Sequence, residues 1–179
     1  SWLVLPLASL AVAEIKFKNS SSFYLLKTSG FNDAPKDITN TLSQIQKEWE
    51  SQKAERNKKL VESLPSKVRT FANDYFSNIA SSVEGEKLLY TASVSGQLPY
   101  ALKTKIPGSN TTPETREIKQ GSLYVYDIKE DLNYLVFDKG ANEILPIFLW
   151  HPDSRHLVSA RNEKVEIVEY DGLNNTTIF

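Results

Sequence analysis

The stretch Trp150-His-Pro-Asp-Ser-Arg-His-Leu-Val158 decides the fold that the sequence predicts. Its centre is rich in residues typical of a tight turn, and the apolar residues that close it are typical of a strand. The segment from Glu84 to Tyr90 has the same order, a polar turn and then a strand, with Gly85 in the place of Ser154. The two segments predict a hairpin unit that recurs along the chain.

A third copy is predicted near the N-terminus, where Ser9-Leu-Ala-Val aligns with the strands that begin at Lys87 and His156. Aromatic-rich partner strands follow the copies, at 23–26, 123–127 and 165–170. The copies lie further apart than the about 40–45 residues of a plain four-stranded blade, so we read the intervening segments as insertions. The spacing leaves two folds open, a partial propeller and an ordinary antiparallel α+β domain.

Three regions differ in character: 1–32, 33–78 and 79–179. In the first, we expect strands at 9–17 and 22–28, because apolar and charged residues alternate from Leu10 to Phe17. The apolar run from Trp2 to Ala13 is too short to span a bilayer. Its Ala-Val-Ala end also fits the remnant of a secretory signal. The strand is favoured because Pro6 splits the run and a basic leader is missing.

The second region, 33–78, is predicted to be a helical insertion. Asp33 or Asp37 is the expected N-cap, and Pro65 is expected to end the helix or to restart it. Apolar residues at helical spacing predict the buried faces, in the first helix at Ile38, Leu42, Ile45 and Trp49, and in the second at Val68, Phe71, Ala72 and Tyr75.

The third region, 79–179, returns to β character. Strands are predicted at 87–92, 122–126, 134–137, 144–150, 156–160 and 164–170, with turn residues between them. The segment from Ile106 to Gly121 has no periodicity and contains a Pro- and Gly-rich stretch, so we expect a mobile surface insertion there.

The segment Trp150–Val158 resembles the W-S-P-D-G-K-x-L-x blade signature of the Tol–Pal propeller and its relatives. Residues 150–172 and 78–92 are similar to the β-propeller region of PEGA-domain envelope proteins of small-genome bacteria. The motif residues are Trp150, His151, Pro152, Asp153 and Ser154, with Gly85 in the other copy. The chain departs from the pattern at Ser82-Val-Glu-Gly85, where the family has Ser-Pro-Asp-Gly, and at His151, where it has Ser.

This resemblance implies a mainly β fold, in which two to three incomplete four-stranded blades of a propeller carry the helical insertion. It also implies an extracytoplasmic protein of the cell envelope that does no known chemistry. Membrane anchorage would come from a segment upstream of this chain. A chain that begins at Ser1, holds no methionine and ends as a strand is about to begin is expected to be part of a longer product.

The composition and the motifs exclude several kinds of chemistry. The chain has no cysteine, so thiolate metal sites and cysteine nucleophiles are excluded, and its net charge of −1 argues against nucleic acid as a partner. His151 and His156 are the only histidines, and neighbours on one tight turn seldom form a catalytic triad with Asp153 and Ser154. No zinc motif such as HExxH is present, and we expect no metal and no cofactor. The acidic group Asp127, Glu130 and Asp131 is expected to cap a hairpin turn.

We therefore expect a non-catalytic binding or scaffold protein whose propeller presents loops to a protein or a glycan. The expected contact residues lie in three loop regions: Ser95 and Gly96, Asn110 and Glu117, Asp138 and Asn142. Two alternatives remain open. In one, the chain is the propeller of a serine peptidase whose catalytic domain lies outside it. In the other, the helical region binds a partner helix.

Overall fold

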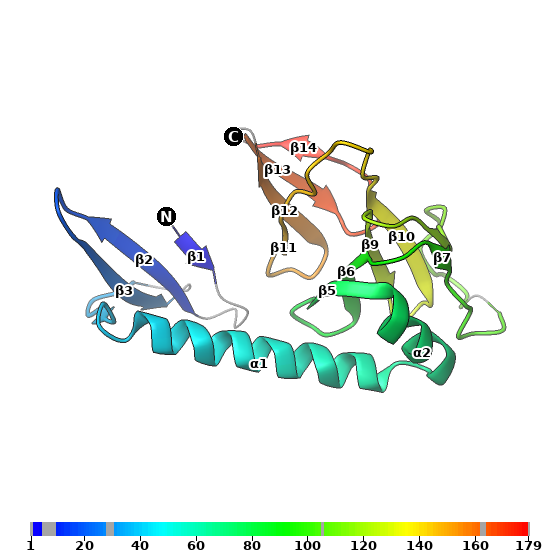
Figure 1. Ribbon diagram of the computed structural model, residues 1–179, viewed down its shortest axis with the longest axis horizontal. Helices are drawn as coiled ribbons and strands as arrows, with labels where there is room; N and C mark the ends of the chain where they lie inside the picture. The colour runs from blue at the N-terminus through cyan, green and yellow to red at the C-terminus, as the bar shows by residue number, and fades with distance from the viewer. Residues whose placement is uncertain (1, 5–9, 28–30, 105, 162–163, 179) are drawn as a thin grey trace. The chain divides into compact units, whose positions relative to one another are not determined.

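The computed structural model describes residues 2–4, 10–27, 31–104, 106–161 and 164–178 (Figure 1). These residues form antiparallel sheets and two helices, so the fold is mainly β, as the sequence predicts, and a closed propeller is not found among them. The chain divides into two compact units, Ser1–Arg56 and Asn57–Phe179, and the division falls inside the predicted helical insertion. Neither described helix is both long and apolar enough to cross a membrane.

The first unit contains a four-stranded antiparallel sheet in the order β1-β2-β3-β4, which we call the N-terminal sheet. Its strands are β1 (Trp2–Val4), β2 (Leu10–Lys16), β3 (Ser21–Lys27) and β4 (Lys36–Asp37). β2 and β3 form the hairpin that the alternating pattern predicts, and the Phe17 amide bonds to the Ser20 carbonyl across its turn at 2.7 Å. The predicted strand ends at 9 and 28 lie outside the described residues.

The helices are α1 (Leu42–Ser63) and α2 (Ser66–Tyr75), so the predicted start at Asp33 or Asp37 is wrong. Asp37 belongs instead to β4, and its carboxylate accepts hydrogen bonds from the amide and the hydroxyl of Thr39. Pro65 separates the helices as predicted, since proline suits the start of a helix and interrupts an existing one. α2 ends at Tyr75 because a strand begins at the next residue.

In the second unit, the helices are followed by a four-stranded antiparallel sheet, the middle sheet, in the order β10-β9-β6-β5. Its strands are β5 (Phe76–Ser81), β6 (Lys87–Ala92), β9 (Leu123–Asp127) and β10 (Leu132–Phe137). Between β6 and β9 the chain adds a two-stranded ribbon, β7 (Gly96–Gln97) with β8 (Glu117–Ile118). The prediction of a surface insertion at 106–121 is wrong for its second half, because Arg116 and Ile118 are buried.

The C-terminal sheet follows, with the order β11-β12-β13-β14. Its strands are β11 (Phe148–Trp150), β12 (His156–Arg161), β13 (Lys164–Glu169) and β14 (Thr176–Thr177). The strand predicted at 144–150 is thus only three residues long. Pro146 has no N–H for a ladder, and the side chains of Ile144 and Ile147 are exposed.

Two hydrophobic clusters cover the two faces of the middle sheet. On one face, Leu88 and Tyr90 pack with Val68 and Ala72 of α2. On the other, Leu89 packs with Leu157 of the C-terminal sheet. Every residue of β6 and β9 is buried, which explains why these strands read as continuous apolar runs without alternation. The second unit is therefore layered, with the middle sheet between helix α2 and the C-terminal sheet.

Candidate functional site

The turn that the sequence predicts twice has the same backbone conformation in both copies. In the first repeat turn (82–87), the Ser82 amide bonds to the Lys87 carbonyl at 2.9 Å, and in the second repeat turn (151–156) the His151 amide bonds to the His156 carbonyl at 2.9 Å. Gly85 and Ser154 both have a positive φ, 75° and 57°. The repeat is therefore present in the structure as well as in the sequence, because equivalent positions form the same main-chain hydrogen bonds.

The two repeat turns also contact each other. The Glu84 amide donates to the Ser154 hydroxyl at 3.1 Å, although the two residues lie far apart in the chain. The Trp150 indole donates to the Ala80 carbonyl at 3.0 Å, so the strand before the second turn is bonded to the strand before the first. The Trp150 and Ser154 side chains of the predicted motif thus join the two sheets, while Pro152 lies exposed between them.

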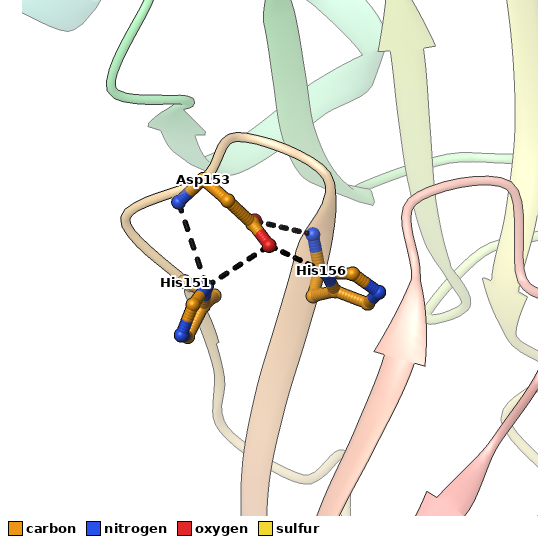
Figure 2. Close-up of side chains that lie close together, drawn as sticks. All are labelled: His151, Asp153 and His156. Carbon is orange, nitrogen blue, oxygen red and sulfur yellow. Dashed lines mark hydrogen bonds and ion pairs between the residues drawn. The ribbon is translucent and has the colours of Figure 1, made fainter.

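Three motif side chains gather on the second repeat turn, as Figure 2 shows. Nδ1 of His156 lies 2.6 Å from Oδ2 of Asp153, and Nδ1 of His151 lies 3.1 Å from the same oxygen. The second ring nitrogen of each histidine points away from the carboxylate. The ligand atoms that these residues offer to a metal ion all lie within 4.8 Å of one another. The chain has no zinc motif such as HExxH, yet this turn brings three potential metal ligands together.

The Asp153 carboxylate is held on both sides. Its Oδ1 accepts the amides of Arg155 and His156, at 2.8 and 3.0 Å. Desolvation acts to raise the pKa of Asp153, but the hydrogen bonds from the Arg155 amide, from His156 and from His151 outweigh it and hold the pKa below its usual value. The carboxylate is thus a fixed negative charge between two imidazoles.

These side chains do not have the geometry of a serine triad. Ser154 is 1% exposed, and its hydroxyl accepts the Glu84 amide. A nucleophile must reach its substrate, and the Ser154 hydroxyl is buried in the contact with the other turn. Asp153 lies within bonding distance of both histidines, whereas the Ser154 hydroxyl bonds to the other repeat turn.

A groove of about 610 Å³ opens beside the second repeat turn, between the middle and the C-terminal sheets. We call it the inter-sheet groove. Its walls come from the starts of β6 and β12, from the turns after β9 and β13, and from the loop at Asn110 and Thr112. Lys129 and Arg155 are its exposed cations, and His156 belongs to its lining. The groove is polar, with charges of both signs.

Inside the groove, one pair of opposite charges is in contact. Lys87 lies 3.7 Å from Asp127 and stacks over the Tyr170 ring at 4.7 Å from its centroid. Burial raises the pKa of Asp127, although the Glu130 amide and Lys87 act to lower it. The Asp127 Oδ1 accepts the Glu130 amide at 2.9 Å, which confirms the predicted cap for Asp127, whereas Asp131 pairs with Arg116.

Asn110, predicted as a loop contact, lies in the inter-sheet groove. Its side-chain amide donates to the Tyr170 hydroxyl at 3.0 Å and to Asp171 at 3.1 Å. Thr112 donates to the same Asp171 oxygen at 2.7 Å. The loop that contains Asn110 is thus bonded to the C-terminal sheet and forms one wall of the groove.

The other predicted contact residues lie away from the groove, where β6 ends and β9 begins. Ser95 is exposed and accepts the Gln120 amide at 2.9 Å, Gly96 and Glu117 lie in the β7–β8 ribbon, and Asp138 pairs with Lys119 at 3.2 Å. Asn142 is exposed in the turn after β10. Four of the six therefore share one end of the middle sheet, and Asn110 belongs to the other.

The sequence analysis did not predict a buried ion pair between Arg116, just before β8, and Asp131, just before β10. Arg116 Nη1 lies 3.1 Å from Asp131 Oδ1, and both residues are at most 5% exposed. Asp131 also accepts the Tyr126 hydroxyl at 2.8 Å and the amides of Ala101 and Leu102. Burial, with a contribution from Asp131, raises the pKa of Tyr126 far above its usual value. The pair could not be predicted, because Arg116 lies in a segment that has no periodic pattern of apolar residues.

Comparison of the chain with protein-family models, with curated proteins and with solved structures finds no match.

Proposed function

We propose that the chain is part of a β-propeller related to the PEGA-domain envelope proteins, and that its sheets are blades. The support is the strand order. Each four-stranded sheet among the described residues runs from edge to edge in chain order, β1 to β4, β5-β6-β9-β10 and β11 to β14, and four-stranded meanders of this kind are the blades of propellers. The repeat turn joins the first two strands of the middle and C-terminal sheets in the same way.

The proposed function is non-catalytic binding, with the inter-sheet groove as the binding surface. The observation that carries it is the groove itself, 610 Å³ of polar space lined by both sheets, whose exposed cations Lys129 and Arg155 stand among acidic side chains. Such a surface suits a polar partner with its own charges and hydrogen-bonding groups, namely a protein segment or a cell-wall glycan. The protein acts in this proposal as a scaffold in the cell envelope, outside the cytoplasm.

The buried Ser154 hydroxyl supports a role without chemistry, because it serves the contact between the repeat turns. The paired state of Lys87 and Asp127 supports it as well. Side chains that are already paired within the protein are held in place, which suits a preformed binding surface.

The test is retention of a partner from an extract of the cell envelope by the immobilised chain. The double variant Lys129→Glu with Arg155→Glu reverses the two exposed cations of the groove, and retention should fall about tenfold or more. Lys139→Glu is the matched control, since Lys139 is an exposed lysine at the other end of the middle sheet.

Loss of retention in the Lys139 variant alone would move the binding surface to the end that carries Ser95, Gly96, Glu117 and Asp138. The proposed function would be contradicted if the immobilised chain retained no envelope component and if all variants retained cytoplasmic proteins equally.

A further inference from the structure

We propose that His151, Asp153 and His156 bind one divalent transition-metal ion, with Zn²⁺ as the ion that fits the donor set best. Two imidazole nitrogens and one carboxylate oxygen are ligands that zinc takes in proteins. The proposal rests on the second repeat turn alone and does not depend on the proposed binding function.

Two of the three distances between ligand atoms in the turn are close to those of a metal site, and the whole set lies within 4.8 Å. Ligand atoms about 2.0–2.2 Å from a tetrahedral ion lie about 3.4 Å apart. Oδ2 of Asp153 is already 3.1 Å from Nδ1 of His151 and 2.6 Å from Nδ1 of His156. A small rotation of these side chains makes room for the ion, because all three lie on one turn at the protein surface.

The proton balance of binding is simple. In a neutral histidine that donates from Nδ1 to Asp153, the proton moves to Nε2 when Nδ1 becomes a ligand. Nε2 of each ring points away from the carboxylate, where this proton meets no carboxylate of the cluster. The ion then replaces the two hydrogen bonds that hold the imidazoles on Oδ2.

The carboxylate is oriented by the backbone before an ion arrives. The amides of Arg155 and His156 hold Oδ1, so Oδ2 is the oxygen left for the metal. The turn itself is fixed by its own main-chain bonds and by the bond from Glu84 to Ser154. Such supporting hydrogen bonds reduce the cost of ordering the ligands.

The first repeat turn is a natural control for this site. It has the same main-chain bonds, but Ser82, Glu84 and Lys87 occupy the positions of His151, Asp153 and His156. Lys87 is a cation paired with Asp127, so this turn offers no comparable ligand set. The two turns share their main-chain bonds and differ in their side chains. Metal binding at the second turn alone would therefore be due to its side chains and not to the shape of the turn.

The experiment is a titration of the tag-free chain with Zn²⁺, followed by calorimetry and by ¹⁵N NMR of the histidine rings. We expect one ion per chain and a shift of the Nδ1 resonances of both histidines. His151→Ser, which introduces the residue of the first repeat turn, and His156→Gln should each weaken binding by about tenfold or more, as should Asp153→Asn.

Glu84→Gln is the matched control, because Glu84 holds the equivalent position in the other turn, and it should bind Zn²⁺ like the wild type. The amide NMR spectrum reports whether each variant is folded. Zn²⁺ binding of equal strength in the wild type and in folded His151→Ser and His156→Gln variants would overturn the proposal. Binding that leaves the Nδ1 resonances unmoved would overturn it as well.

Discussion

The amide of Glu84 donates a hydrogen bond to the hydroxyl of Ser154 at 3.1 Å, so the two copies of one turn are bonded directly to each other. Ser154 is buried and has a left-handed backbone at φ 57°. Its side chain therefore replaces the glycine of the other copy at a conformational cost, and the bond between the turns offsets that cost.

Ser154→Ala should lower the free energy of unfolding by about 1 kcal/mol, because it removes the acceptor of the part-buried Glu84 amide and keeps the backbone strain. Ser154→Gly removes the strain together with the hydroxyl, so its loss should be smaller. Urea unfolding measures both. A smaller loss for alanine than for glycine would contradict the backbone strain at this position, and no loss in either variant would contradict the role of the hydroxyl.

Gly172→Ala should be far more damaging than Gly108→Ala. Both glycines have a positive φ, 82° and 78°, which costs an alanine about 1–2 kcal/mol. A Cβ on Gly172 would also lie 2.3 Å from the Leu135 carbonyl oxygen, whereas a Cβ on Gly108 would meet nothing within 4 Å. We expect an additional loss of about 1–3 kcal/mol in the Gly172 variant, measured by thermal or urea unfolding. Equal losses in the two variants would show that the backbone near Leu135 can move away from the new Cβ without a loss of stability.

Arg116→Met should destabilise the second unit by about 3–5 kcal/mol, since it removes the arginine that pairs with both Asp131 and Glu114 in a buried site. Asp131→Asn should cost less, because the Arg116 guanidinium keeps its ion pair with Glu114 at 2.7 Å. The double variant should lose much less than the sum of the two. A double-mutant cycle from urea unfolding measures this coupling, and additive losses would argue that the two side chains act independently.

Thr39→Val should raise the pKa of Asp37, whereas Thr39→Ser should leave it low. The backbone and side-chain hydrogen bonds of Thr39 hold that pKa below the ordinary value of 3.8. Because the folded-state pKa is lowered, the bond from Thr39 stabilises the fold above pH 3.8, and this contribution is lost as the pH falls through the folded-state pKa. An NMR titration of the Asp37 carboxyl carbon checks the shift, and an identical pKa in both variants would contradict its cause.

Asn57→Ala should loosen the edge strand β5. The Asn57 amide donates to the Ile79 carbonyl at 2.7 Å, and its oxygen accepts the Ser81 amide at 3.1 Å, so one side chain occupies two groups of an open strand edge. We expect a loss of about 1–2 kcal/mol and faster hydrogen exchange of the Ser81 amide. Unchanged exchange at Ser81 would show that solvent already reaches this edge.

The strands that could be predicted from sequence are those that carry apolar side chains in a regular pattern. β6 was predicted with its exact bounds, since all six of its residues are buried. β5 was missed because it follows α2 directly and contains Asn78 at φ 51°, which breaks the register with β6. The strands β4, β7 and β8 are two residues long, which is too short to leave a side-chain pattern in the sequence.

The candidate site was predictable as a turn but not as a cluster. The order of turn residues placed Asp153 and Ser154 correctly, because turn propensity is local. The meeting of His151 with His156 depends on the bond between the His151 amide and the His156 carbonyl, which closes the turn. No spacing rule for helices or strands encodes that closure.

Helix α1 passes through the division between the two compact units at Arg56 and Asn57. Its last turns are anchored, with Val61 buried in the cluster of the second unit and Asn57 bonded to β5. Starting a helix is the costly step, while extending one adds a bond for each residue ordered. The part of α1 in the second unit can therefore act as the nucleus of the helix. The charged turns before Asn57 can then form by extension of the helix toward its N-terminus.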